Sequence, residues 1–94
     1  MTLLLATYLV TAYCSCPACT GHSHGLTASG HRAGPGTVAA DWRVLRPGTR
    51  LWVPGYGRGV VRDTGSRIRG RRLDVWFRTH REAVKWGRKK VRIR

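Results

Sequence analysis

Three aspartates in a very basic chain are the residues best suited to chemistry. The chain has 94 residues, of which 18 are Lys or Arg and only 4 are Asp or Glu. Asp41 follows the apolar run Val38–Ala40, Asp63 ends the segment Val60-Val61-Arg62-Asp63, and Asp74 lies inside Leu73–Phe77. When two carboxyl groups lie close together, one raises the pKa of the other by charge repulsion, which keeps a proton donor available near neutral pH. The aspartates are therefore the candidates for acid–base chemistry in this chain.

Asp74 is the aspartate that a turn explains least well. The apolar residues of Leu73–Phe77 alternate with Asp74 and Trp76, which therefore share the other face of a predicted strand. A carboxyl group beside an aromatic plate suits a sugar ring, because the acid reaches the glycosidic oxygen and the plate covers the C–H groups. The other two have an alternative role in turns: Asp41 could cap the segment that follows it, and Asp63-Thr64-Gly65 could be an Asx turn.

A second group of reactive residues lies near the N-terminus. Cys14, Cys16 and Cys19 are followed closely by His22 and His24. Cys14, Cys16, Cys19 and His22 have a spacing that could hold a structural zinc ion. A local disulfide, or thiols packed as small apolar groups, fits the same residues, because three cysteines in one loop are no disulfide framework. We expect catalysis to require no cofactor.

The elements that must position these residues are short. Glycine and proline separate segments rich in β-branched and aromatic residues, which predicts a small all-β domain. The predicted strands are Thr7–Tyr13, Thr37–Ala40, Leu51–Val53, Gly59–Arg62, Leu73–Phe77 and Val91–Arg94. Thr79 and Glu82 have the spacing of a capping box, which predicts one short α-helix ending at Gly87. The length suits a single domain, 1–94, with a Cys/His-rich loop at 14–25.

The net charge of +14 predicts attraction to polyanions. Peptidoglycan or another anionic cell-wall polymer fits better than nucleic acid, because no nucleic-acid-binding motif accompanies the basic runs Arg67–Arg72 and Arg88–Arg94. The apolar start MTLLLATYLV is too short to span a membrane and has no basic segment before it. We therefore expect no membrane span and no ordinary export signal. A trimmed or phage-encoded protein that acts outside the cell, at the wall, fits these features.

Taken in order, the segments resemble the three-aspartate (3D) domain. The resemblance is carried by TASGHRAGPGTVAAD at 27–41, by GTRLWVPGYGRGVVRDTGSRIRGRRLDVWF at 48–77 and by THREAVKWG at 79–87. This domain occurs in bacterial stationary-phase muralytic proteins and forms part of membrane-bound lytic transglycosylase A. The resemblance implies a six-stranded double-psi β-barrel with a groove in which the three aspartates gather.

The resemblance also implies a reaction. Lytic transglycosylases cleave the bond between N-acetylmuramic acid and N-acetylglucosamine without water. The residues that match are Asp74 as the catalytic acid, Asp63 as its supporting carboxylate and Asp41 as the third member. The acid protonates the leaving oxygen, then takes the proton of the muramoyl 6-hydroxyl as a 1,6-anhydro ring closes. It must therefore be protonated near neutral pH, unlike the second carboxylate of an ordinary glycosidase.

Other residues could contact the glycan through hydroxyl groups, backbone or aromatic faces. The candidate substrate-binding residues are Thr27, Ser29, Thr64, Gly65, Tyr56 and Trp76. Turn hydrogen bonds are the alternative role for the hydroxyl groups, and core packing is the alternative for the aromatic rings. The stretch at 65–70 is bulkier and more basic than the Gly-Gly-Ala-Ile-Lys-Gly usual in the family.

Two other classes of protein share some of these features. Asp63-Thr64-Gly65 contains the Asp-Thr-Gly of aspartic proteases, and the length suits a retroviral-type homodimer. Arg62 disfavours that class, since it stands where those enzymes have an apolar residue, and Leu73-Asp74-Val75 replaces their later apolar-apolar-Gly segment. A non-catalytic module that binds cell-wall glycan or builds a phage particle is the alternative outside enzymes, because a fold does not fix a function.

Overall fold

The computed structural model describes residues 6–16 and 26–94. The strands are β1 (Thr7–Tyr13), β2 (Thr37–Ala40), β3 (Arg50–Val53), β4 (Gly57–Asp63), β5 (Arg72–Trp76) and β6 (Lys89–Arg92), and α2 (His80–Trp86) lies between β5 and β6. The expectation of a mostly β chain with one short helix near the C-terminus is confirmed. β1 and β2 have the predicted bounds, and the other strands differ from them by no more than two residues at either end.

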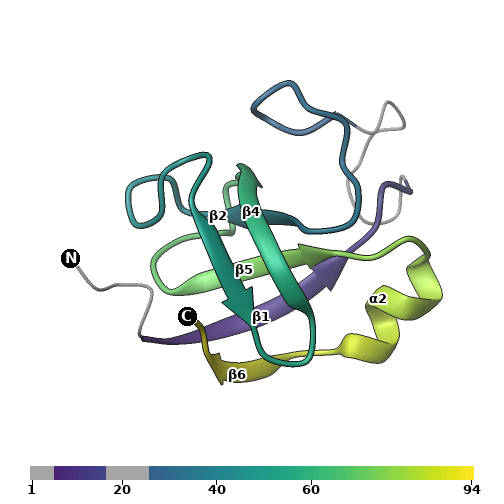
Figure 1. Ribbon diagram of the computed structural model, residues 1–94. Coiled ribbons are helices and arrows are strands. Elements are labelled where there is room, and N and C mark those ends of the chain that lie inside the picture. Colours follow the sequence, from purple (N-terminus) through teal and green to yellow (C-terminus); the bar gives the residue numbers. More distant parts are fainter. Residues whose placement is uncertain (1–5, 17–25) are drawn as a thin grey trace.

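The six strands form one curled, half-barrel sheet in the order β3-β4-β2-β5-β1-β6 (Figure 1). β1 pairs with β5 and β2 with β4 in parallel, whereas the other three pairings are antiparallel. Just beyond β6, Arg94 exchanges two backbone hydrogen bonds with Trp52 of β3, with N–O distances of 2.6 and 3.0 Å. The chain that follows one edge strand thus reaches the other edge strand.

Alternation along the strands separates a core face from an outer face. In β5, Leu73 and Val75 are fully buried, whereas Asp74 and Trp76 are only partly buried on the other face. The predicted division of this strand is therefore confirmed. The core cluster consists of Tyr8, Val10, Val38, Ala40, Leu45, Leu51, Val53, Val61, Leu73, Val75, Trp86 and Ile93.

The predicted capping box is present at the start of α2. The Thr79 hydroxyl accepts from the backbone N–H of Glu82 at 3.1 Å, and the Glu82 carboxylate accepts from the N–H of Thr79 at 3.2 Å. Gly87 ends the helix with φ of 74°, a backbone conformation that glycine adopts without strain. The Trp86 indole donates to the Val10 carbonyl at 3.1 Å, which fixes the helix against β1.

Two parts of the predicted organisation differ from the structure or lie outside it. The last strand begins and ends two residues earlier than predicted, because its pairing with β1 runs from Lys89 to Arg92. Of the loop predicted at 14–25, the structure describes 14–16. Within residues 6–16 and 26–94, no helix is both long enough and apolar enough to cross a membrane.

Candidate functional site

Asp63 and Asp74 flank a single alanine of the central strand β2. Ala39 pairs with Asp63 of β4 on one side and with Asp74 of β5 on the other. Directly opposite residues of neighbouring strands project to the same face, and strands lie about 4.8 Å apart. The two aspartate backbones are therefore about 10 Å apart with one methyl group between them. The sheet itself, rather than a loop, positions two carboxyl groups over Ala39.

A register shift in the sheet is what selects Asp63 for this place. The pairing of β2 with β4 shifts between Val38 and Ala39, so Asp63 rather than Arg62 opposes Ala39. Without the shift, the strict alternation that follows buried Val61 would place Arg62 beside Ala39. The irregularity thus exchanges a cation for a carboxylate in the row.

Asp74 lies in an environment that favours its protonated form. Its carboxyl group is partly buried and accepts a hydrogen bond from the Thr11 hydroxyl of β1 at 3.0 Å. Burial raises the pKa of Asp74 from 3.8 to about 6, and the negative charge of Asp63 adds to this rise. The Thr11 hydrogen bond and the charge of Arg72 act in the opposite direction. A substantial fraction of Asp74 is therefore protonated at mildly acidic pH.

Asp63 is held by donors on both of its carboxylate oxygens. Oδ1 accepts from the backbone N–H groups of Ala28 and Thr64, each at 2.9 Å, and Oδ2 accepts from the Tyr13 hydroxyl at 3.2 Å. Burial, and next the charges of Asp63 and Asp74, raise the pKa of Tyr13. Tyr13 therefore stays a neutral phenol that donates to Asp63. The second carboxylate is fixed in place from three different segments.

Asp41 has a different set of partners. Its side chain is buried, and it accepts from the backbone N–H of Gly70 at 2.9 Å and from the backbone and Nε of Arg43 at 3.0 and 3.2 Å. Arg69 lies 3.9 Å away. These contacts, with the Gly70 hydrogen bond first, lower the pKa of Asp41 to about 2. The structure brings Asp63 and Asp74 together, whereas Asp41 joins the turn after β2 to the segment 65–70.

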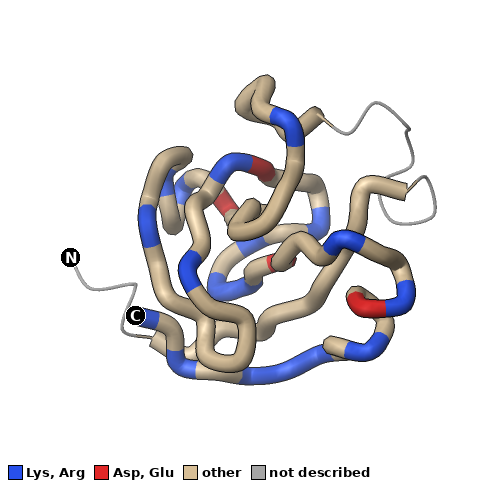
Figure 2. The backbone as a smooth tube through the Cα atoms, turned by 45° about the vertical axis from the view of Figure 1, so that its right-hand side comes forward, with Lys and Arg blue, Asp and Glu red and all other residues tan. Residues whose placement is uncertain are grey.

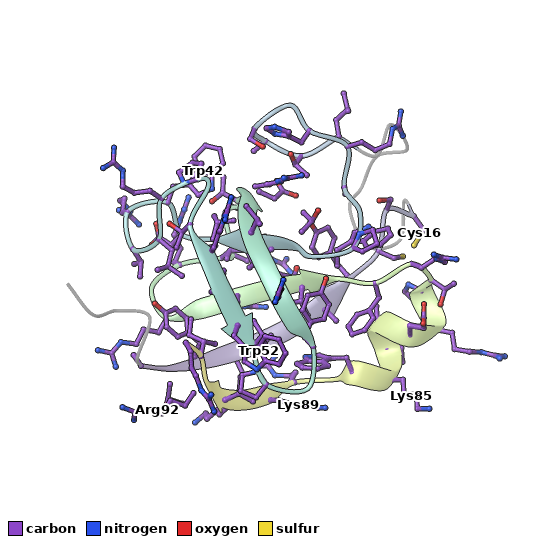
Figure 3. All side chains as sticks on the ribbon, viewed as in Figure 1. Cys16, Trp42, Trp52, Lys85, Lys89 and Arg92 are labelled. Carbon is purple, nitrogen blue, oxygen red and sulfur yellow. The ribbon has the colours of Figure 1, made fainter. Side chains whose placement is uncertain are left out.

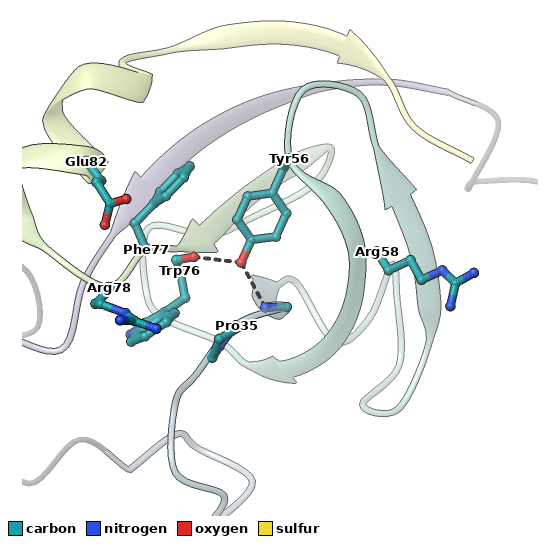
Figure 4. A pocket seen from close by; sticks show the side chains of 8 residues that line it. Pro35, Tyr56, Arg58, Trp76, Phe77, Arg78 and Glu82 are labelled. Atoms are coloured by element: carbon teal, nitrogen blue, oxygen red, sulfur yellow. Dashed lines mark hydrogen bonds between the residues drawn. The ribbon is translucent and has the colours of Figure 1, made fainter.

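Beside Trp76 the surface is hollowed into a pocket of about 370 Å³ (Figure 4). The lining residues are Pro35, Gly36, Tyr56, Arg58, Trp76, Phe77, Arg78 and Glu82. The Tyr56 hydroxyl donates to the Trp76 carbonyl at 2.6 Å and accepts from the N–H of Gly36 at 3.1 Å. Its ring packs edge-on against Phe77, with centroids 5.3 Å apart. Tyr56 therefore builds the wall, while Trp76 shares the outer face of β5 with Asp74.

A family model described as the 3D domain matches residues 36–94, which is more than half of the chain. The chain belongs to the 3D domain family. The chain is similar to parts of two proteins of Bacillus subtilis (strain 168). It is 36% identical over 85 residues to YabE, which is named as a cell wall shaping protein, and these cover 89% of this chain and 21% of YabE. It is 33% identical over 92 residues to YocH, named as a cell wall-binding protein, covering 94% of this chain and 31% of YocH. The chain thus spans a fifth to a third of these relatives.

Replacing Asp41 with Asn tests whether this residue of the 3D domain has a structural role. The folded-state pKa of about 2 lies below the ordinary value of 3.8, so ionised Asp41 stabilises the fold above about pH 4. This contribution disappears as the pH falls through about 2. We expect the variant to unfold at a lower temperature at pH 7 and to lose less stability between pH ~4 and ~2 than the wild type. Thermal unfolding followed by circular dichroism at several pH values measures both effects. A variant with unchanged stability at pH 7 would contradict this role.

The predicted glycan-binding hydroxyl groups take part in turn hydrogen bonds. The Thr27 and Ser29 hydroxyls are 3.0 Å apart, and Ser29 lies 2.8 Å from Nδ1 of His31. Thr27 also accepts from the N–H of His31 at 3.2 Å. This network shapes the turn whose Ala28 N–H donates to Asp63. Thr27 and Ser29 thus help to position the carboxylate.

The other two candidates, Thr64 and Gly65, follow Asp63 directly. The N–H of Thr64 donates to the Asp63 carboxylate at 2.9 Å. The carbonyl of Gly65 accepts from the N–H of Ile68 at 3.0 Å, which closes a turn. Ile68 is buried and packs with Tyr13 and Ala39 on the outer face of the sheet. The segment after Asp63 therefore covers part of the face that carries the two carboxyl groups.

Three residues of this site were missed in the sequence. Thr11 and Tyr13 reach Asp74 and Asp63 from β1, and Ala39 separates the two carboxyl groups. Each partner lies at least 24 residues away along the chain, so no local spacing indicates the contacts. These contacts depend on the order and register of the strands. The alternation in β1 indicates only that Thr11 and Tyr13 share a face.

The predicted zinc ligands are described only in part. Cys14 and Cys16 lie within 4.8 Å of each other and of His80, measured between their potential ligand atoms. Cys19 and His22 lie outside the described residues. The Cys/His cluster defined by Cys14, Cys16 and His80 is therefore the part of the predicted metal site that has a geometry.

Proposed function

We propose that this 3D domain cleaves the glycan strands of peptidoglycan as a lytic transglycosylase, with Asp74 as the catalytic acid. The observation that carries the proposal is the placement of Asp63 and Asp74 on either side of Ala39, with the pKa of Asp74 raised to about 6. An acid with a pKa near the working pH is available both to give and to take a proton. This is the requirement of a reaction in which one group does both.

The proposed reaction uses the bond between N-acetylmuramic acid and N-acetylglucosamine. Protonated Asp74 gives its proton to the glycosidic oxygen as the bond to the muramoyl C1 breaks. The resulting carboxylate then takes the proton of the muramoyl 6-hydroxyl, whose oxygen bonds to C1 and closes the 1,6-anhydro ring. Asp74 ends protonated, as it began. Asp63 raises the pKa of Asp74 and stabilises positive charge that develops on the ring in the transition state.

The pocket beside Trp76 suits an anionic glycan. Trp76 offers an indole next to Asp74, and its Nε1 is held by the Ser15 hydroxyl at 2.9 Å. Arg58 and Arg78 line the same pocket and could pair with carboxylates of the stem peptides. Lys and Arg positions are spread over much of the backbone, in keeping with the net charge of +14 (Figure 2). The names of YabE and YocH support a cell-wall polymer as partner and the wall as the place of action.

A binding module without catalysis is the second candidate function. YocH is named as a cell wall-binding protein, and it aligns with 94% of this chain. The same pocket and the same positive charge would hold a wall polymer without cutting it. This candidate requires no protonated Asp74, which is the difference that an experiment can use.

The complete fold proposed is the double-psi β-barrel. Two parallel pairings, β1 with β5 and β2 with β4, support the two ψ loops. The two backbone hydrogen bonds between Arg94 and Trp52 support closure of the curled sheet. Closure would leave the core inside and the two carboxyl groups on the outer face.

Incubation with purified, dye-labelled peptidoglycan separates the two candidate functions. The transglycosylase releases soluble dye with time, at a rate proportional to protein concentration. A binding module pellets with the polymer and releases none. Pelleting without release, under conditions where a known muralytic enzyme is active, would exclude the catalytic proposal.

The pH dependence of release tests the pairing of the two aspartates. Because Asp74 must be protonated, we expect the rate to fall about tenfold per pH unit above its pKa of about 6. Asp63→Asn removes a negative charge that raises this pKa, so the falling limb should move to lower pH. The position of the limb is measured, rather than its height, because a loss of folded protein does not move it. A limb that stays in place or moves to higher pH would refute the coupling.

A further inference from the structure

The Cys/His cluster joins two segments that are 64 residues apart in the sequence. The Sγ atoms of Cys14 and Cys16 are 3.0 Å apart, and Sγ of Cys16 lies 3.6 Å from Nδ1 of His80. All three potential ligand atoms lie within 4.8 Å of one another. Cys14 directly follows β1, and His80 is the first residue of α2. Figure 3 shows Cys16 beside this end of the helix.

The sheet brings these segments together. β1 and β5 are parallel, and their last pair is Tyr13 and Trp76. The segments that follow the two strands therefore leave the sheet at the same end. The N–H of Phe77 donates to the Tyr13 carbonyl at 2.8 Å, and the Trp76 indole donates to the Ser15 hydroxyl at 2.9 Å. These bonds fix the positions of both cysteines relative to β5.

The capping box fixes the third member. Thr79 and Glu82 hold the backbone immediately before His80 in one conformation through reciprocal hydrogen bonds. His80 itself is solvent-exposed, whereas Cys14 is buried. The cluster therefore has two sulfur ligands on one segment and a nitrogen ligand at the start of a short, well-capped helix.

We propose that Cys14, Cys16 and His80 supply three of the four ligands of a structural zinc ion that fastens the end of β1 to α2. Two thiolates and an imidazole are the ligand types that structural zinc prefers. In a tetrahedral site with ordinary bond lengths, the ligand atoms lie about 3.5–3.8 Å apart, so an ion requires the two sulfurs to separate by less than about 1 Å. A disulfide between Cys14 and Cys16 would use both sulfurs and leave His80 without a role in the cluster. The zinc site explains why all three residues meet.

The proposed ion adjoins the candidate site without being part of its chemistry. Tyr13, whose hydroxyl donates a hydrogen bond to Asp63, directly precedes Cys14. The Trp76 indole donates a hydrogen bond to Ser15, which lies between the two cysteines. An ion would therefore hold the C-terminal ends of β1 and β5 in register. This inference rests on the cluster alone and stands whether or not the chain cleaves glycan.

Metal binding by the purified full chain tests the inference through readouts other than activity. We expect about one zinc per chain by elemental analysis, and a cobalt-loaded protein with the absorption of tetrahedral, thiolate-bound cobalt. His80→Ala should lower the zinc affinity, measured in competition with a chromogenic chelator, by a factor of about 10 to 100. Because His80 is exposed, this variant should fold, which circular dichroism checks. His31→Ala is the matched control, and its affinity should equal that of the wild type.

Three outcomes would overturn the inference. The first is the absence of zinc and cobalt binding by the reduced wild-type chain. The second is binding that His80→Ala leaves unchanged, because the metal would then be held without the helix. The third is a protein purified under non-reducing conditions whose mass shows Cys14 and Cys16 joined by a disulfide and which takes up no zinc after reduction. Cys16→Ser should match His80→Ala in its loss of affinity if the inference is correct.

Discussion

Replacing Asp74 with Asn is expected to lower the rate of glycan cleavage by a factor of about 10² to 10⁴ without lowering stability at pH 7. Asn cannot donate a proton as an acid, but its amide oxygen can still accept the hydrogen bond from Thr11. The folded-state pKa of Asp74, about 6, lies above the ordinary value of 3.8, so the wild-type fold loses stability as the pH rises between these values. The variant has no such loss.

The combination of lost cleavage and retained stability identifies a catalytic group. Dye release from peptidoglycan gives the rate, and urea unfolding at pH 7 gives the free energy of unfolding. Asp41→Asn is the matched control, since it also removes one carboxylate charge but should leave the rate per folded molecule close to that of the wild type. An Asp74→Asn variant that cleaves at the wild-type rate would remove the basis of the proposed mechanism.

Replacing Trp86 with Ala is expected to cost about 3–5 kcal/mol in the free energy of unfolding. The indole is 7% exposed, and its ring packs against Tyr56 and Phe77 with centroids 6.3 and 5.8 Å away. Its Nε1 donates to the Val10 carbonyl of β1 at 3.1 Å. The substitution removes this packing and leaves a buried carbonyl without its donor. A loss of this size is a large part of the stability of a domain of this length.

Trp86→Phe separates the two contributions. Phenylalanine keeps most of the apolar contact with Tyr56 but has no N–H for Val10, so it should cost clearly less than alanine. Urea unfolding curves of both variants give the two values. A cost below about 1 kcal/mol for Trp86→Ala would mean that α2 contributes little to the core.

The sequence was informative where the signal is local. The alternation of apolar and polar residues in Leu73–Phe77 placed Asp74 and Trp76 together on the outer face, as the structure has them. The Thr79 and Glu82 spacing predicted the capping box, because its two hydrogen bonds join residues three positions apart. Such features depend on neighbouring residues, so a single sequence contains the information.

The arrangement of the site depends on contacts between residues far apart in the sequence, which no local pattern predicts. The row of Asp63, Ala39 and Asp74 requires the strand order and a register shift between Val38 and Ala39. Without that shift, Arg62 would oppose Ala39 instead. The approach of His80 to Cys14 likewise follows from the parallel pairing of β1 and β5. Residue spacing predicted zinc ligands within one loop, and could not indicate a histidine from a distant helix.

The products released from purified peptidoglycan show whether this domain acts as a lytic transglycosylase. Mass spectrometry distinguishes 1,6-anhydromuramoyl ends, which only the intramolecular attack of the 6-hydroxyl forms, from the reducing ends left by hydrolysis. We expect the wild-type protein to form anhydro ends, and Asp74→Asn to form them about 10² to 10⁴ times more slowly. Reducing ends alone, or anhydro ends that Asp74→Asn forms at the wild-type rate, would contradict the proposed mechanism.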